Sequence, residues 1–207
     1  MSHMTNPLAT PDQLFQRRSF GALPIELQDI IFFATQCLTQ SAGVLLQLPQ
    51  SVTAQANVLL ARYWLVEPIM SHEFSSAYHA FHTRLLALEA RILYALSFDT
   101  HVALPHPLAV TYLQALEFLG AKKERIGKRA VAYLNTALLS PQMLYLTSQP
   151  NALAVAAVYN AARDVGAKMP ECEWWEVFDV DREELGFLVE EAARAMDEKM
   201  DAMETGV

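Results

Sequence analysis

Apolar residues recur at three- and four-residue spacing along most of the chain, which is the pattern of amphipathic helices. Residues 24–41 carry one apolar stripe, made of Leu27, Ile30, Ile31, Ala34 and Leu38. A second helix is predicted over residues 49–65, with an apolar face of Val52, Ala56, Leu59, Leu60 and Tyr63. A third is predicted over residues 84–96, with Leu85, Leu88, Ile92 and Leu96 in helical register.

Pro105 and Pro107 mark a boundary, because proline disfavours helix in the residue before it. Helices are predicted beyond it at residues 108–119, 126–139, 150–165 and 181–200. The helix at 150–165 is apolar nearly all round, which predicts a central position among its neighbours. Asp181 and Glu184 have the spacing of a capping box. With no useful β-alternation, the pattern predicts an all-α fold of two similar helical groups joined by short connections.

Composition narrows the class of protein. Apolar residues make up 53% of the 207 residues and charged residues 18%, which excludes a disordered chain and allows a sizeable core. The formal charge of -8 disfavours a primary role in reading DNA or RNA. Cys37 and Cys172 lack the spacing of thiolate zinc sites or of a disulfide framework. No membrane span or secretory signal is predicted, and residues 1–4 look like a cloning remnant.

Few side chains have a pattern that indicates chemistry. His72, His79 and His82, with Glu73 nearby, are the best metal candidates, but surface histidines are the favoured interpretation, so no metal or cofactor is predicted. Glu171, Glu173 and Glu176 surround Trp174 and Trp175, a pattern typical of a short amphipathic turn that buries one indole. A basic cluster could contact a phosphate or an acidic peptide, or could be a solvated helix end; its members are Lys122, Lys123, Arg125, Lys128 and Arg129.

Several segments together resemble the cyclin family, and within it the transcriptional L-type cyclins. Residues 42–50 (AGVLLQLPQ) and 58–64 (VLLARYW) are similar to the first two family helices, and residues 89–99 (EARILYALSFD) to the fifth helix and its exit. The second family repeat is matched by residues 105–117, 149–163 and 174–178 and by the capped helix from Asp181.

The resemblance implies two consecutive cyclin-box bundles, the first one shortened. The expected boundaries are a tag remnant and N-terminal extension at 1–19, a reduced first repeat at 20–103, and a second repeat with an acidic tail at 104–207. It implies a non-enzymatic regulatory subunit that binds and activates a cyclin-dependent kinase acting in transcription or pre-mRNA processing. Nuclear localisation and kinase or other nuclear protein partners are expected. The residues that match the family's kinase-contacting positions are Glu89, Leu93, Phe98, Thr100 and His101.

The chain departs from the family between Trp64 and Glu89. The family has two helices in this interval, and the first carries a lysine followed by paired acidic residues, whereas no lysine occurs here before Lys122. Losing this helix would expose the apolar faces of the helices at 27–38, 52–63 and 85–96. Residues 71–81 are therefore expected to form a shortened replacement, or a partner to cover the gap. The departure leaves a second interpretation open, a cyclin-fold scaffold that does not activate a kinase.

Overall fold

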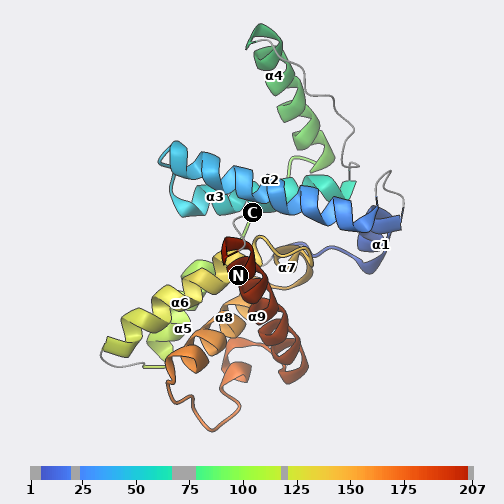
Figure 1. Ribbon diagram of the computed structural model, residues 1–207. Coiled ribbons are helices and arrows are strands. Elements are labelled where there is room, and N and C mark those ends of the chain that lie inside the picture. The colour runs from blue at the N-terminus through green and yellow to red at the C-terminus, as the bar shows by residue number, and fades with distance from the viewer. Residues whose placement is uncertain (1–5, 20–23, 67–77, 118–120, 205–207) are drawn as a thin grey trace.

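The computed structural model describes residues 6–19, 24–66, 78–117 and 121–204, without the side chains of 16–19, 78–86, 121–122 and 198–204. Its elements are α1 (Pro11–Ser19), α2 (Ile25–Leu45), α3 (Gln50–Val66), α4 (Tyr78–Ala95), α5 (Pro105–Ala115), α6 (Ala121–Ala137), α7 (Leu144–Thr147), α8 (Pro150–Val165), the 3-10 helix η2 (Trp174–Phe178) and α9 (Arg182–Glu204). These described residues contain no strand, and the predicted all-α fold is confirmed (Figure 1). None of the described helices is long and apolar enough to cross a lipid bilayer.

Helix α8 is the centre of the second half of the chain, as its sequence predicts. It packs against α5, α6 and α9, which surround it (Figure 1). Pro150 begins the helix, where no N–H is needed, and Gly166 ends it in the left-handed conformation at φ +64°. Ala154, Val155 and Val158 are completely buried, so the helix is apolar all round because it has neighbours all round.

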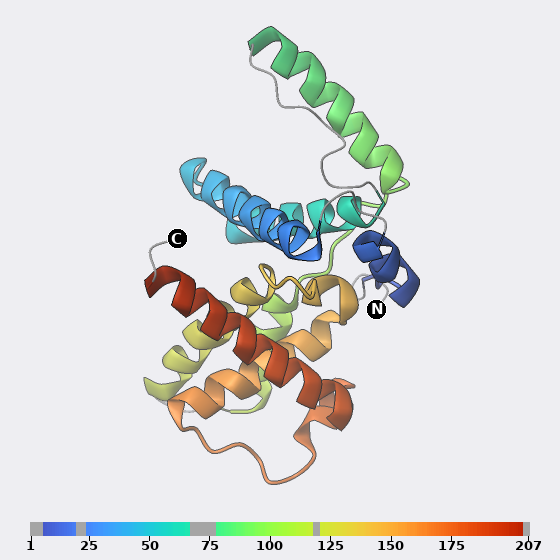
Figure 2. The same cartoon turned by 45° about the vertical axis from the view of Figure 1, so that its right-hand side comes forward.

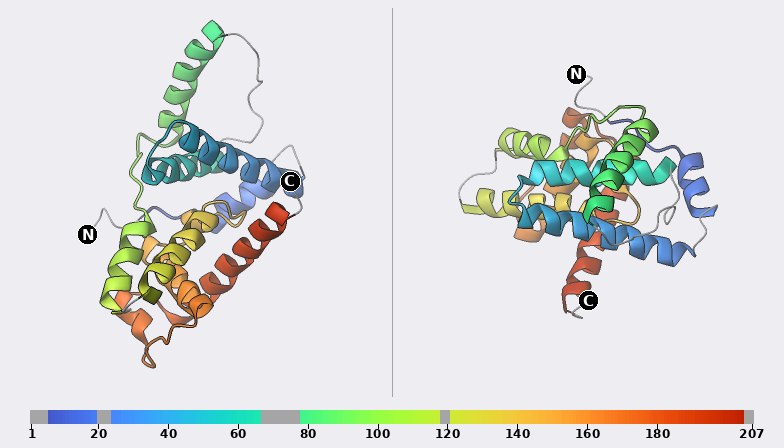
Figure 3. Two further views of the ribbon diagram at one scale, coloured as in Figure 1. Left: turned by 60° about the vertical axis from the view of Figure 1, so that its left-hand side comes forward. Right: turned by 90° about the horizontal axis from the view of Figure 1, so that it is seen from above.

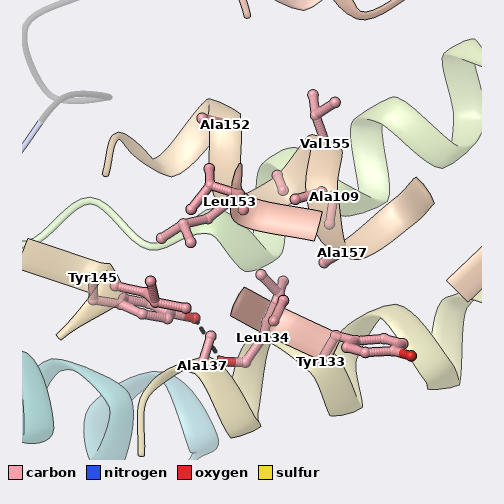
Figure 4. Close-up of a cluster of buried hydrophobic side chains, with 14 of the residues drawn as sticks. Ala109, Tyr133, Leu134, Ala137, Tyr145, Ala152, Leu153, Val155 and Ala157 are labelled. Atoms are coloured by element: carbon pink, nitrogen blue, oxygen red, sulfur yellow. Dashed lines mark hydrogen bonds between the residues drawn. The ribbon is translucent and has the colours of Figure 1, made fainter. Parts of the chain in front are cut away.

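The core around α8 is closed by aromatic side chains. The hydroxyl of Tyr145 in α7 donates a hydrogen bond of 3.1 Å to the backbone carbonyl of Leu134 in α6 (Figure 4). In η2, Trp174 is buried and stacks on Tyr159 with 6.4 Å between ring centroids, whereas Trp175 is half-buried. The prediction that a short turn buries one of these two indoles is confirmed.

The N-terminus of α9 has the predicted cap. One carboxylate oxygen of Asp181 accepts hydrogen bonds from the backbone N–H groups of Glu183, at 2.9 Å, and Glu184, at 2.8 Å. Such a cap contributes about 1 kcal/mol by satisfying donors that the helix leaves without partners. It fixes where α9 begins, and from there the helix packs along α8 and α6.

In the first half, α2 and α3 lie side by side as a helical hairpin (Figures 1 and 2). The two helices approach closely where Gly43 meets the first turn of α3. A Cβ atom at position 43 would collide with Oγ1 of Thr53 and lie 2.9 Å from its Cγ2. Glycine at this position therefore lets the two backbones come together.

The apolar stripe predicted on α2 is largely exposed, which is the outcome expected for a shortened first repeat. The buried residues of α2 are Gln28, Phe32, Gln36 and Gly43. Ile30 and Leu38, on the opposite side of the helix, are 63% and 69% exposed. Phe32 packs into the molecule beside Trp64, with 5.5 Å between the ring centroids. The physical reason is that, among the described elements, α2 packs mainly against α3, and the larger apolar stripe lies on the opposite side of α2.

The prediction for α3 is wrong in part. Tyr63 is buried and Leu59 and Leu60 are half-buried, but Val52 and Ala56 are exposed. The face that packs inward contains Thr53, Ala54, Asn57, Val58, Ala61 and Arg62. As on α2, the inner face is more polar than the periodicity predicts.

Helix α4 extends away from the α2–α3 hairpin and meets it near one end (Figures 2 and 3). Its contact with the rest of the described fold is slight and lies mainly against α3. The expected exposure of the apolar faces of the first half is therefore observed on α2 and α3, and Leu88 on α4 is also exposed. Residues 71–77 of the expected replacement helix lie outside the described residues, and α4 begins at Tyr78. The predicted domain boundary at residue 103 falls in the connection between the end of α4 at Ala95 and the start of α5 at Pro105. It stays a prediction.

Candidate functional site

The candidate partner-binding residues lie at the C-terminal end of α4 and in the segment that follows it. Glu89 and Leu93 are four residues apart, so they lie on neighbouring turns of one helix face. Glu89 is exposed and Leu93 is half-buried. Phe98 is 61% exposed, which is unusual for a large aromatic side chain within a defined turn. Glu89 and Leu93 therefore share one face of α4, and Phe98 follows in the turn that ends the helix.

A backbone motif joins Leu93 to Phe98. The N–H of Phe98 donates a hydrogen bond of 2.8 Å to the Leu93 carbonyl, and the N–H of Ser97 donates one of 3.0 Å to the Tyr94 carbonyl. This pair of bonds is a Schellman motif, which satisfies the last carbonyls of the helix. Ser97 and Phe98 adopt φ of +50° and +60°, a conformation that favours glycine. In this turn the Phe98 ring lies against that of Tyr94, with 5.3 Å between the ring centroids.

Thr100 and His101 lie in the exposed connection between α4 and α5, whose backbone is fixed by hydrogen bonds to side chains. The N–H of His101 donates to the Asp99 carboxylate at 3.1 Å. Nη1 of Arg62, from α3, donates to the His101 carbonyl at 2.8 Å. Burial lowers the pKa of Arg62, and the negative charge of Asp99 opposes this effect. The structure thus brings the five predicted residues onto one continuous stretch, from the last turns of α4 to the start of α5.

A residue that the sequence did not indicate, Asn6, also holds the connection between α4 and α5. Asn6, which lies in the predicted N-terminal extension outside both repeats, is only 6% exposed. Its side-chain Nδ2 donates to the Ala103 carbonyl at 2.8 Å, and its Oδ1 accepts from the Ala103 N–H at the same distance. Nη2 of Arg62 lies 3.4 Å from this oxygen. One asparagine therefore pairs with both backbone groups of Ala103, as a neighbouring strand would.

The same asparagine is also tied to the second half. Its backbone N–H and carbonyl both bond to the side-chain amide of Gln149, at 3.2 Å each. The N–H of Ala9 donates to the Leu146 carbonyl at 2.7 Å. The N-terminal segment thus connects α3, the 99–104 connection and the start of α8. A lone Asn before a proline gives no sequence signal for this role.

The basic cluster of α6 is only partly available to a ligand. Nε of Arg129 pairs with Asp164 of α8 at 2.7 Å, and the Tyr133 hydroxyl donates to the same oxygen at 2.8 Å. The hydrogen bond to Asp164 raises the pKa of Arg129. Lys128 pairs with Glu124 at 2.7 Å on the exposed surface. Lys123 and Arg125 are exposed, and the Lys122 side chain lies outside the described residues.

The remaining candidates provide no chemical centre within the described structure. His72 and Glu73, and the side chains of His79 and His82, lie outside the described residues. Among the residues that are described, no group of three or more His, Cys, Asp or Glu side chains could hold a metal ion. Glu171, Glu173 and Glu176 are exposed around η2.

Curated relatives give the same family as the sequence pattern. The chain is 36% identical over 128 residues to an uncharacterized cyclin-L1-like protein of Schizosaccharomyces pombe, covering 62% of this chain and 46% of the relative. It is 26% identical to cyclin-L1 of Danio rerio, covering 70% of this chain and 38% of the relative. The chain is a relative of the L-type cyclins. This cyclin relative spans less than half the length of these proteins. No family model matches it.

A solved structure supports the fold. A chain of the yeast RNA Pol II CTD kinase CTDK-1 complex superposes with a TM-score of 0.75, covering 92% of this cyclin relative and 73% of that chain. The sequence identity is 14%, so this likeness concerns the fold alone. It fits the two consecutive helical bundles, the first one shortened, that the cyclin resemblance implies.

Proposed function

We propose that the chain is a cyclin-type regulatory subunit that binds and activates a cyclin-dependent kinase. The observation that carries the proposal is the group of Glu89, Leu93 and Phe98 at the end of α4. Glu89 and Phe98 are exposed, and Leu93 is half-buried next to a turn in which Ser97 and Phe98 adopt positive φ. The curated relatives named cyclin-L support the class of protein, and a solved relative of the fold comes from a kinase complex.

A preformed helical surface can activate a kinase without taking part in the chemistry. Phosphoryl transfer requires the kinase's own Lys–Glu ion pair, which depends on the position of its helix C. A subunit that contacts the inward position of helix C better than the outward one shifts the population toward the active state. Leu93 and Phe98 would supply apolar contact to a side chain of that helix, and Glu89 a charge-assisted hydrogen bond.

The first test is binding. The purified chain, carrying Glu89→Ala, Phe98→Ala or no substitution, is mixed with a panel of purified cyclin-dependent kinases, and affinity is measured by calorimetry. We expect Phe98→Ala to weaken the binding of one kinase by about tenfold or more, as for an aromatic anchor at an interface centre. Glu190→Ala is the matched control, because Glu190 is an exposed helical glutamate on α9. Equal affinities for all variants, or no kinase bound, would overturn the proposal.

The second test is activation. Kinase turnover is compared with and without a saturating amount of the chain. An increase that Phe98→Ala reduces supports an activating subunit.

A second function is favoured by a specific observation. No lysine precedes Lys122, and no helix is described between α3 and α4. The lysine with which Glu89 would act in the family is therefore missing. A cyclin-fold scaffold that binds a kinase or another nuclear protein without activating it fits this departure. A bound kinase whose turnover does not change would favour the scaffold over the activator.

The proposed cellular role is what the resemblance to the L-type cyclins implies. We propose that the chain acts in the nucleus, in transcription or pre-mRNA processing. Fluorescence microscopy of the chain with a C-terminal fluorescent protein tests the compartment, and a purely cytoplasmic signal would contradict it.

A further inference from the structure

The surface that most needs an explanation is the outer stripe of α2, defined as Leu27, Ile30, Ala34, Leu38 and Leu45. These positions follow helical spacing and lie opposite Phe32 and Gln36, which face the core. Ile30, Leu38 and Leu45 are 63%, 69% and 83% exposed. With a rise of 1.5 Å per residue, the stripe is about 27 Å long. An apolar strip of this length is normally covered in a stable protein.

The charge pattern around the stripe is equally unusual. From residue 30 to residue 61 the sequence contains no Asp, Glu, Lys, Arg or His, although charged residues form 18% of the chain. Both helices of the hairpin therefore present almost only neutral groups to their surroundings. The exposed corner between them adds Val44, Leu46 and Leu48. A face without cations offers little to an anionic lipid surface, and a face without charge offers no ionic contact to a charged partner.

We propose that the outer stripe of α2 packs against the same stripe of a second copy of this chain. With a net charge of -8, two copies repel each other wherever acidic faces meet. The α2–α3 hairpin is the large neutral surface at which this repulsion is smallest. A two-fold axis brings identical patches together, so a patch must tolerate contact with itself, and an uncharged apolar stripe does.

The resulting arrangement is a standard one for helices. One face of the hairpin already packs on the second half of its own chain, through Phe32 and Val58. A second hairpin on the outer face would place α2 between two layers, where a helix apolar on both sides belongs. The proposal does not depend on kinase binding, because none of the residues in the stripe belongs to the candidate site on α4.

Sedimentation equilibrium on the purified full chain tests the proposal directly. We expect a mass of twice 23.1 kDa at tens of micromolar protein. Leu38→Glu should raise the dissociation constant at least about tenfold, because each copy would bury a carboxylate in an apolar contact. Leu38→Lys should have the same effect while lowering the net negative charge, which separates burial from overall repulsion.

The matched control is Val177→Glu, which adds the same charge at a position that is 81% exposed in η2. It should leave the dissociation constant unchanged. Leu38 is already exposed in one chain, so its variants should keep the helical circular dichroism of the parent. If they do not, Leu38→Gln, which is neutral and compatible with helix, replaces them.

A single-chain mass for the unmodified protein at the highest soluble concentration would overturn the proposal. An equal loss of association in Val177→Glu would also overturn it, because charge and not the stripe would then control association. The proposal would also be overturned if the protein is a monomer and the stripe is protected from hydrogen exchange only in a kinase complex. In that case the kinase, and not a second copy of the chain, would cover the stripe.

Discussion

Helices α2 and α8 are both long and apolar, yet they have opposite relations to the rest of the molecule. Helix α8 is surrounded by α5, α6 and α9, and its Val158 is fully buried. Among the described elements, helix α2 packs mainly on α3 and leaves Leu38 69% exposed. The apolar content of a helix indicates how many neighbours it could pack against, and the rest of the fold determines how many it has. Within the described residues, the second half is a completed bundle, whereas the first half leaves apolar helix faces uncovered.

The largest expected effect comes from truncating one leucine in each half. Leu134→Ala in the core of the second half should lower the free energy of unfolding by about 2–5 kcal/mol, because it removes a buried side chain and leaves a cavity. Leu38→Ala should change the stability of a single chain by about 0.5 kcal/mol or less. Urea denaturation at a protein concentration that gives single chains measures both. Similar losses for the two variants would mean that the first half is as complete as the second.

The next effect concerns the segment that joins the halves. Asn6→Ala should lower the free energy of unfolding by about 1–3 kcal/mol, because Ala103 and Gln149 would lose their hydrogen-bond partner in a buried place. Asn6→Asp keeps an acceptor for the Ala103 N–H but loses the donor to its carbonyl, so an intermediate loss is expected. Thermal unfolding of the three proteins compares them. No loss in Asn6→Ala would contradict the anchoring role.

A smaller effect is expected at the end of α4. Ser97→Gly should stabilise the last turn by up to about 1 kcal/mol, because glycine adopts positive φ without the cost that serine has. Hydrogen exchange of the Phe98 amide, which closes the Schellman motif, measures this locally. Since α4 has few contacts with the core, we expect slower exchange with little change in melting temperature. A parallel rise in melting temperature would show that α4 unfolds together with the second half.

The smallest effect is a dependence on pH at the start of α5. Burial lowers the pKa of His106, while its hydrogen bond of 3.1 Å to Asn135 opposes this shift. The unfolded chain therefore binds this proton more readily than the folded chain. Stability should rise as the pH rises from below the folded pKa to above 6.5, the ordinary value for histidine. Denaturation of the parent and of His106→Gln across this range should show the contribution only in the parent.

The sequence predicts the fold of the second half of the chain better than that of the first half, and the difference has a physical reason. Pro150, the apolar run after it and the Asp181 cap define α8 and the start of α9, since local chemistry and burial favour the same ends. On α2, the stripe gives the correct helix but does not show which face is buried, because periodicity identifies a face and not what covers it. Gln36 lies inside because that side of α2 meets α3, where its amide lies 3.4 Å from the Asn57 carbonyl.

The partner-binding role of Glu89, Leu93 and Phe98 stays a prediction from the resemblance. The structure places these residues in the last turns of α4 and in the turn that follows it. The support behind them could not be selected, because Arg62 and Asn6 lie far away in sequence and act through backbone groups. A contact between a side chain and a distant carbonyl has no signature in a single sequence.

The buried position of Asn6 has a practical consequence for anyone who purifies this protein. An affinity handle or fusion joined directly before residue 6 would lie beside a side chain that holds the two halves together. Its bulk would compete with the packing of residues 6–9. Handles for pull-down work therefore belong away from this segment.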